Sequence, residues 1–208
     1  MKAKVTIIDH PVIQDKLGCL RNKETSGPDF RRLMYELSSF LMYEASSKFK
    51  TIDEQIETPL ATAMVKKVAD TPIIVSIMRA GNGMVEGLLS VLPKASAGHI
   101  GIYRDKFINN TVEYFFKVPE QIKGECVFIA DPLMATGDTA VACVDRLKQY
   151  GPRSITFLSF LVAPEGLEKL HHFHPDVEVF ALHKEEGLNG EGSLIPGLGD
   201  AGNRLYQQ

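Results

Sequence analysis

Three features that would narrow the class of this protein are scarce or missing in its sequence: cysteine, an excess of basic residues and a long apolar run. Its three cysteines, Cys19, Cys126 and Cys143, are an odd number without C-x-x-C spacing, which favours buried thiols in a reducing compartment, here the cytoplasm. The net charge of −3, from 26 acidic and 23 basic residues, gives no general attraction for nucleic acid or for an anionic membrane. No apolar stretch of about 18 residues occurs and no apolar segment typical of a signal peptide, so we expect neither a spanning helix nor a secretion signal.

What the sequence does contain is the composition of an ordinary globular protein. Hydrophobic residues make up 44% and charged residues 24% of its 208 positions. A chain of this length buries about 70% of its unfolded surface in one core. No repeat, low-complexity tract or linker divides it, so we expect a single domain over residues 1–208.

The most informative stretch covers residues 126–140. Its first five residues are apolar and typical of a buried parallel strand, and Asp131 follows them directly. The small residues 135–137 let a backbone come close to a ligand, and the apolar spacing from Thr139 onward predicts a helix whose N-terminus favours an anion. An anion site beside a carboxylate suits a sugar phosphate. Because neither G-x-G-x-x-G nor a Walker A spacing is present, the stretch alone also fits an ordinary strand–turn–helix.

Alternating apolar patterns along the chain predict an α/β fold, a mostly parallel sheet flanked by helices. The predicted strands cover residues 5–8, 73–78, 98–103, 126–130, 154–162 and 177–182, and the predicted helices cover residues 26–48, 60–68, 84–91, 139–150 and 165–171. Asn109 and Asn110 separate two runs that carry aromatic residues, which predicts a β-hairpin projecting from the sheet at about 104–118.

Two arginines stand at the ends of predicted strands. In open α/β sheets ligands bind beyond the carboxyl ends of the strands, so Arg79, Arg104 and Asp131 are expected to share one crevice. Guanidinium groups bind phosphate oxygens with paired hydrogen bonds and keep their charge. The turn at residues 79–83 offers a second small-residue backbone for an anion, which suggests a pyrophosphate. Each arginine taken alone is more often a solvated surface residue.

Short sequence blocks spread over nearly the whole chain match the sequence pattern of a known protein family. They include Met78–Gly81, Gly98–Asp105, Asp131–Pro132 with Ala135–Gly137, Ala163–Gly166 and Ile195–Gly202. With these blocks the chain resembles the uracil phosphoribosyltransferase family. The resemblance implies a type I phosphoribosyltransferase-like fold with a uracil-binding hood at about 184–204. It also implies transfer of phosphoribosyl from phosphoribosyl pyrophosphate (PRPP) to uracil, giving UMP and pyrophosphate in pyrimidine salvage.

The resemblance also implies roles for individual residues. PRPP would be bound by Arg79, Arg104, Asp131, Pro132, Leu133, Met134, Ala135, Thr136, Gly137, Asp138, Thr139 and Asp200. Uracil would be bound by Ile195, Gly199, Asp200 and Ala201. Asp131, Asp200 and Arg104 would be catalytic, because cations must face the leaving pyrophosphate and carboxylates the cationic ribose. The implied cofactor is Mg²⁺, which Asp200 would meet indirectly through PRPP.

Three single residues and one short segment depart from the family pattern. Asp138 stands where the family normally has glycine, and a second carboxylate in an anion cradle weakens binding unless it points outward or is neutralised. We expect Asp138 to point outward. Asn82 replaces an apolar residue in the pyrophosphate turn, residues 191–193 replace His-Gly-Tyr, and Asn203 replaces an aspartate.

Two other functions compete with the implied one. A phosphoribosyltransferase for another nucleobase fits the altered residues 191–193, and a non-catalytic regulator that senses PRPP or a nucleotide fits Asp138. The acidic net charge argues against a regulator that binds nucleic acid. The resemblance further suggests a homodimer or higher homo-oligomer, and GTP, which activates some relatives, is a candidate effector.

Overall fold

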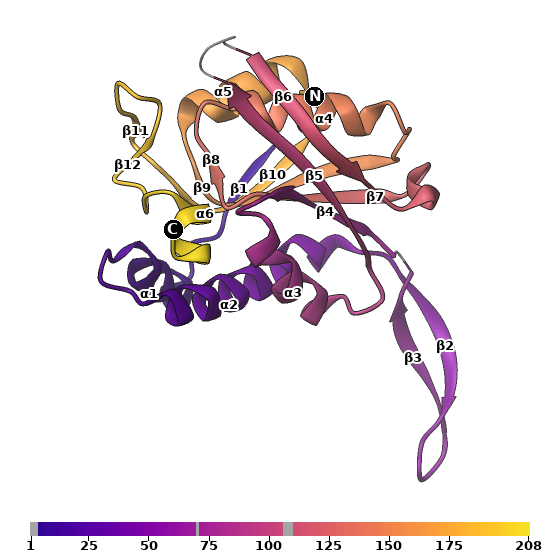
Figure 1. Ribbon diagram of the computed structural model, residues 1–208. Helices are drawn as coiled ribbons and strands as arrows, with labels where there is room; N and C mark the ends of the chain where they lie inside the picture. The colour runs from indigo at the N-terminus through magenta and orange to yellow at the C-terminus, as the bar shows by residue number, and fades with distance from the viewer. Residues whose placement is uncertain (1–3, 70, 106–109) are drawn as a thin grey trace.

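The computed structural model describes residues 4–69, 71–105 and 110–208, without the side chains of residues 104 and 105. An eight-stranded sheet forms its centre (Figure 1). Its strands follow in the order β1 (Val5–Ile7), β10 (Glu178–Lys184), β9 (Ser154–Val162), β7 (Cys126–Ala130), β4 (Ile73–Met78), β5 (Ser96–Asp105) and β6 (Asn110–Lys117), with β8 (Leu133–Met134) also paired to β9. Strands β5 and β6 run antiparallel, and the other neighbours run parallel.

Helices cover both faces of this sheet, as Figure 1 shows. One layer contains α1 (Pro11–Arg21), α2 (Gly27–Ala45) and α3 (Asn82–Val91), and the other contains α4 (Asp138–Lys148) and α5 (Pro164–Phe173). Side chains alternate along each strand, so Ile74 and Phe128 join the core against α1–α3 while Val75 and Ile129 join the core against α4 and α5. The predicted α/β fold is therefore confirmed.

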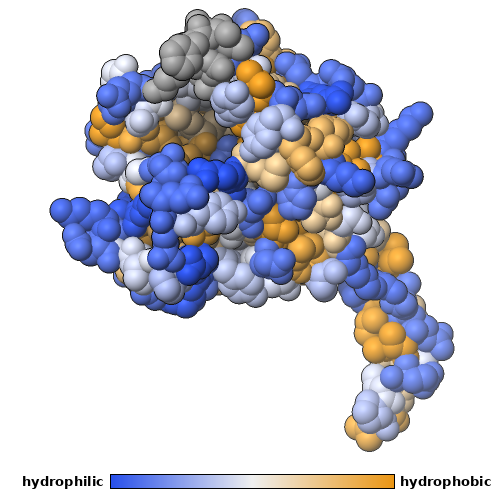
Figure 2. All heavy atoms as spheres, in the orientation of Figure 1, coloured by the Kyte–Doolittle hydropathy of each residue, from blue (hydrophilic) through white to orange (hydrophobic). Residues whose placement is uncertain are grey.

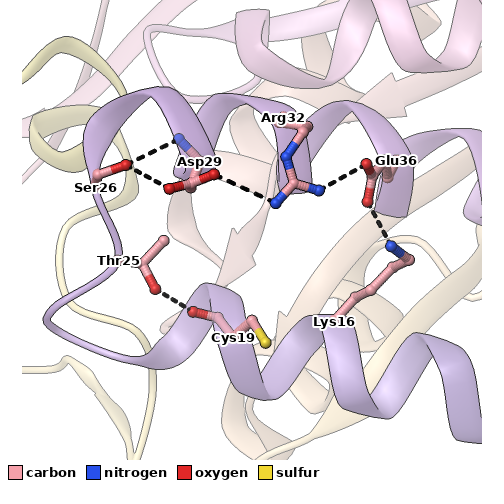
Figure 3. Close-up of polar contacts among 7 residues, drawn as sticks. All are labelled: Lys16, Cys19, Thr25, Ser26, Asp29, Arg32 and Glu36. Atoms are coloured by element: carbon pink, nitrogen blue, oxygen red, sulfur yellow. Dashed lines mark hydrogen bonds and ion pairs between the residues drawn. The ribbon is translucent and has the colours of Figure 1, made fainter.

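Helix α2 begins where the sequence places a capping residue before a proline. Ser26 Oγ accepts a hydrogen bond from the backbone N–H of Asp29 at 3.3 Å. A line of polar contacts then runs from Asp29 through Arg32 and Glu36 to Lys16 of α1, whose Nζ lies 2.6 Å from Glu36 Oε2 (Figure 3). These contacts tie the outer faces of α1 and α2. Helix α2 and a 3₁₀ turn at Ser46–Lys48 confirm the helix predicted over residues 26–48.

The prediction of a helix at residues 60–68 is wrong. Strand β2 (Thr51–Glu57) pairs antiparallel with β3 (Thr62–Val68) instead, and this hairpin projects from the body in Figure 1. Its turn is closed by Thr58, which donates its backbone N–H to the carbonyl of Ala61 at 3.0 Å. Leu60, Met64 and Val68 lie four residues apart, so they imitate a helical stripe.

The remaining elements are the β5–β6 pair, a short strand pair and a helix near the C-terminus, and a 3₁₀ turn. The antiparallel pair β5–β6 occupies the region of the hairpin expected at about 104–118, and its tip, residues 106–109, lies outside the described residues. Near the C-terminus, β11 (Gly187–Leu188) pairs with β12 (Leu194–Ile195), and α6 (Ala201–Tyr206) packs on α2. A second 3₁₀ turn covers Glu120–Ile122. Among the helices of the described residues, none has the length and apolarity to cross a membrane.

Candidate active site

A cleft of about 390 Å³ opens beyond the carboxyl ends of β4 and β7. It is lined by Ala80, Asp131, Leu133, Ala135, Gly192, Ser193, Leu194, Gly199, Asp200, Ala201 and Gly202. Six of these residues were assigned to the site from sequence: Asp131, Leu133, Ala135, Gly199, Asp200 and Ala201. Segments about 70 residues apart along the chain thus face one another across a cleft at the ligand-binding edge of the sheet.

The loop between β7 and α4 surrounds a second, smaller hollow of about 100 Å³ that shares Asp131 with the cleft. Thr136, Gly137 and Thr139 line this hollow at the first turn of α4. Gly137 has a φ of 81°, and a Cβ there would lie 2.8 Å from the carbonyl oxygen of Gly166. Only glycine fits this conformation and this contact, so the loop can pack against α5 while its backbone N–H groups stay beside the hollow.

Asp131 lies where the cleft and the small hollow meet. Its backbone N–H donates to the carbonyl of Leu158 at 3.1 Å, which fixes the residue to the middle of β9. Burial raises the pKa of the Asp131 carboxyl to about 7, against a weaker lowering by the N–H of Leu133, which lies 3.5 Å from Oδ1. The charged carboxylate is therefore costly in the free protein, and it gains from ligand groups that donate hydrogen bonds.

Asp138 turns toward α5, away from the small hollow beside the β7–α4 loop. Its Oδ1 forms an ion pair with Lys169 Nζ, and its Oδ2 accepts a hydrogen bond from Thr136 Oγ1 at 2.8 Å. The carboxylate lines a separate hollow between α4 and α5, of about 240 Å³, together with Val141 and Lys169. Asp138 is thus both directed away from the small hollow and faced by a positive charge, the two conditions under which a carboxylate is tolerated beside an anion site.

The family resemblance implies that the β7–α4 loop binds PRPP. On that basis replacement of Lys169 by methionine is expected to raise the KM for PRPP about fivefold, because one positive charge beside this loop is lost while Asp138 keeps its charge. The double variant Asp138→Asn with Lys169→Met should return the KM to within twofold of the wild-type value. Steady-state kinetics with PRPP varied at saturating uracil measures both. Lys148→Met is the matched control, since Lys148 pairs with Asp176 at the other end of α4. A KM in Lys169→Met equal to that of the control would disprove the electrostatic role.

Arg79 follows β4 after a cis peptide bond and is exposed. Its guanidinium donates to Gln208 Oε1 at 2.5 Å and to Asn203 Oδ1 at 3.4 Å, and it lies 5.8 Å from the centre of the Tyr206 ring. Helix α6 and Gln208, which follows it, therefore orient the arginine with neutral partners. The backbone of Arg104 pairs with Thr111 at the end of β5, and its side chain lies outside the described residues.

A polar network lies beneath the turn that carries Arg79. Ser76 is fully buried on β4, and its Oγ lies 2.7 Å from both Asn82 Oδ1 and His99 Nδ1. Asn82, the residue that departs from the family pattern, thus contacts the neighbouring strand β5 as well as its own turn. The network holds the first turn of α3 against the sheet with hydrogen bonds where an apolar residue would pack.

Three further residues assigned from sequence also lie apart from the cleft lining. Pro132 is buried, and its carbonyl accepts from the N–H groups of Phe160 and Leu161 at 3.0 Å each. Met134 belongs to the core beside α4 and also lines the small hollow. Ile195 is 45% exposed on β12, while Leu194 lines the cleft in its place. These residues support the loops or flank the cleft.

Asp200 can contribute to a Mg²⁺ site. Its Oδ1 accepts from the N–H of Asn203 at 2.7 Å and caps α6, and its carboxylate lines the same cleft as Asp131. Within the described part of the chain no group of three or more metal-ligating side chains occurs. Magnesium keeps several waters and binds through one or two carboxylates together with substrate phosphates. Two aspartates on one cleft fit that mode of binding.

Sequence reasoning missed several residues that shape the site. Lys169 lies 31 residues from Asp138, and Gln208 lies 129 residues from Arg79. Arg21 and Glu185, 164 residues apart, meet beside the loop that follows β12. Each of these contacts depends on elements that come together only in the fold, so no local motif marks them.

Comparison with known proteins agrees with this geometry. The profile of the family described as uracil phosphoribosyltransferase matches residues 7–208. Uracil phosphoribosyltransferase from Legionella pneumophila is 47% identical over 98% of this chain and 95% of that protein. The enzyme of the same name from Sinorhizobium fredii is 44% identical over 97% of both chains.

Solved structures show the same fold. The AQ2163 protein from Aquifex aeolicus superposes with a TM-score of 0.92 at 32% identity, covering 97% of each chain. A hypoxanthine-guanine phosphoribosyltransferase from Bacillus anthracis superposes with a TM-score of 0.52 at 10% identity over 76% of this chain and 80% of that one. The latter likeness concerns the fold alone, which is that of the type I phosphoribosyltransferases.

Proposed function

This chain belongs to the uracil phosphoribosyltransferase family, and we propose that it transfers the phosphoribosyl group of PRPP to uracil, giving UMP and pyrophosphate. One observation carries the proposal for this chain's own residues. Asp131, at the end of β7, and the segment from Gly199 to Ala201 line the same cleft. A sugar phosphate on the first and a base on the second would present the anomeric carbon to the base nitrogen.

The loop between β7 and α4, called the phosphate loop from here on, binds the ribose 5′-phosphate, and Asp131 binds the ribose. Backbone N–H groups at the start of α4 and the Thr139 hydroxyl donate to the 5′-phosphate, supported by the helix dipole. The Asp131 carboxylate accepts hydrogen bonds from the ribose hydroxyls. As the bond to pyrophosphate breaks, the sugar ring becomes cationic, and the same carboxylate stabilises that charge.

The leaving pyrophosphate develops negative charge at the other end of the breaking bond. Arg79 binds its oxygens, held in place by Asn203 and Gln208, and Arg104 at the end of β5 is proposed as a second arginine for the same group. Asp200 faces both the donor and the base. When bound, Mg²⁺ neutralises part of the charge on the pyrophosphate and is held through PRPP oxygens, with Asp200 beside it.

Backbone groups read the base. Uracil presents an acceptor, a donor and an acceptor along one edge, and the backbone at Gly199 and Ala201 can offer the complementary order. Cytosine would leave buried polar groups unpaired, and unpaired groups give discrimination of about 10⁴ in favourable sites. Residues 192–194 close the cleft from β12, so the departures from the family pattern at residues 191–193 bear on how the base is enclosed.

One assay tests the function. The protein is incubated with PRPP, Mg²⁺ and each nucleobase in turn, and nucleotide formation is followed by chromatography. We expect UMP from uracil, with at least about 10³-fold lower kcat/KM for cytosine. Product from a purine base in preference to uracil would support a different base specificity. No product with any base would contradict an enzymatic function and favour a PRPP sensor.

We propose in addition that the chain forms a homo-oligomer through the β2–β3 hairpin. Leu60 is 97%, Met64 64% and Ile52 54% exposed on this hairpin, and Figure 2 shows hydrophobic side chains along it. A two-stranded hairpin is marginally stable in water by itself, so these side chains favour a covering partner, here a second copy. Light scattering on the purified protein should give at least twice the 23.0 kDa chain mass.

The reducing cytoplasm remains the proposed location, consistent with three cysteines that form no disulfide.

A further inference from the structure

Two arginines hold consecutive carbonyl groups of the loop between β12 and α6. Arg21 Nη1 donates to the carbonyl of Gly197 at 2.8 Å, and Arg204 Nη1 donates to the carbonyl of Leu198 at 2.8 Å. The next residue, Gly199, lines the cleft. The loop that is proposed to read the base is therefore fixed by side chains immediately before its base-facing segment.

Arg21 is itself held by a buried carboxylate. Its Nη1 lies 2.6 Å from Glu185 Oε1, and the side chains are 20% and 0% exposed. The backbone N–H of Glu185 donates to the carbonyl of Val162 at 2.9 Å, which fixes this residue to the end of β9. Its second oxygen, Oε2, is buried and has no hydrogen-bond partner among the described residues. Removing Arg21 alone would leave an uncompensated buried charge, so the pair is locked in place.

Arg204 connects the same loop to the C-terminal end of α1. Its Nη1 also donates to the carbonyl of Arg21 at 3.3 Å, and its Nη2 donates to the carbonyl of Asn22 at 2.6 Å. The guanidinium lies 4.5 Å from the centre of the Phe30 ring on α2. The carbonyl groups at the end of a helix favour a positive charge, so Arg204 is held there with no carboxylate partner among the described residues.

The loop borders two hollows. Gly199 and Asp200 line both the cleft and a hollow of about 520 Å³ that Arg21 and Arg204 also line. Because the carbonyls of Gly197 and Leu198 are bound by the arginines, the position of the loop depends on them. A shift of about 1 Å in such a loop is enough to misalign hydrogen bonds to a base.

We propose that the Arg21–Glu185 pair and Arg204 form a clamp that positions the base-reading loop and thereby determines affinity for uracil. The proposal rests on the proposed function. Arg21, Glu185 and Arg204 act here as positioning residues, because none of them lines the cleft that holds Asp131. Their loss should therefore affect the base more than PRPP.

The test separates positioning from stability with two variants. Arg21→Met leaves the buried Glu185 carboxyl without its partner, and the variant should unfold at a lower temperature than the wild type. The double variant Arg21→Met with Glu185→Met removes both charges, so its unfolding temperature should return close to the wild-type value. It still lacks the donor to Gly197. We expect its KM for uracil to be raised at least tenfold, with the KM for PRPP within twofold of the wild type.

Lys16→Met is the matched control on the same helix, since Lys16 pairs with Glu36 on α2 (Figure 3) and lines neither of the two hollows beside the loop. It should leave both KM values unchanged. A double variant whose KM for uracil stays within twofold of the wild type, or whose KM for both substrates rises equally, would overturn the clamp. Failure of the proposed function is recognised separately, because the wild-type protein would then form no UMP.

Discussion

Asp131→Asn is expected to lower kcat/KM for PRPP by about 10³, since it removes the charge that stabilises the cationic ribose while keeping the shape of the side chain. The variant retains an acceptor oxygen for the ribose hydroxyls, so the KM for PRPP should change less than kcat. Steady-state kinetics with both substrates varied measures the two parameters. A kcat/KM within tenfold of the wild-type value would exclude Asp131 from charge stabilisation.

The pH dependence of the same reaction follows from burial of Asp131. Burial raises its pKa to about 7, so in the free enzyme the reactive carboxylate form is lost as the pH falls through that value. We expect kcat/KM for PRPP in the wild type to decline below about pH 7. The decline due to Asp131 should be absent in Asp131→Asn. Phosphate groups of PRPP also titrate, with a second pKa near 6, and that contribution is common to both proteins.

Stability should move in the opposite direction to activity. The folded pKa of about 7 lies above the usual 3.8, so the protonated group favours the folded state below pH 3.8, and this contribution is lost as the pH rises to about 7. The difference corresponds to about 4 kcal/mol, and because water in the open cleft reaches this side chain we expect about half of it. Asp131→Asn should thus be more stable than the wild type by about 2 kcal/mol at pH 8 and by less at pH 5.

Asp29→Asn provides a control with the opposite sign. Hydrogen bonds from Ser26 and then Arg32 lower the pKa of Asp29 below its usual value, so its carboxylate stabilises the folded protein above that value and the contribution is lost in acid (Figure 3). Its replacement should therefore not raise the unfolding temperature at pH 8. Equal effects of the two substitutions would show that the stability gain in Asp131→Asn has another cause.

Strand β7, the loop with Asp131 and helix α4 could be predicted from the sequence, because the residues that indicate them lie next to one another in the chain. An apolar run, a carboxylate and small residues before a helical spacing lie within residues 126–140, and β7 and α4 form there. The residues that contact the site from elsewhere in the chain could not be predicted in the same way. Lys169 meets Asp138, and Glu185 meets Arg21, only after the sheet has assembled, and neither lysine nor glutamate carries a local signal for such contacts.

The wrongly predicted helix at 60–68 shows a different limit. Leu60, Met64 and Val68 fit a helical period, yet the same segment reads as a strand whose partner β2 lies directly before it. Pro59 and the Thr58 hydroxyl, which donates to the carbonyl of Ala61 at 2.7 Å, make the turn that decides between the two. Helix α1 was missed although Pro11 occupies its first turn and Ile13, Leu17 and Leu20 are buried along it.

Arg79→Met is expected to lower kcat/KM for PRPP by about 10², because the leaving pyrophosphate loses a cation that its developing charge requires. Arg79 is exposed and its partners among the described residues, Asn203, Tyr206 and Gln208, are neutral, so they orient its charge without cancelling it. The unfolding temperature should therefore change little. Arg32→Met is the control, since Arg32 is also exposed but pairs with Asp29 and Glu36 on α2.

The variant Arg79→Lys separates the contribution of the positive charge to kcat/KM from that of the guanidinium geometry. Lysine keeps the charge but loses the planar fork that binds two phosphate oxygens, so we expect a loss of about tenfold in kcat/KM, intermediate between wild type and Arg79→Met. The inhibition constant of pyrophosphate should rise in the same order across the three proteins, because the product makes the same contacts. Wild-type affinity for pyrophosphate in Arg79→Met would place the leaving group elsewhere, and Arg104 at the end of β5 would then be its principal arginine.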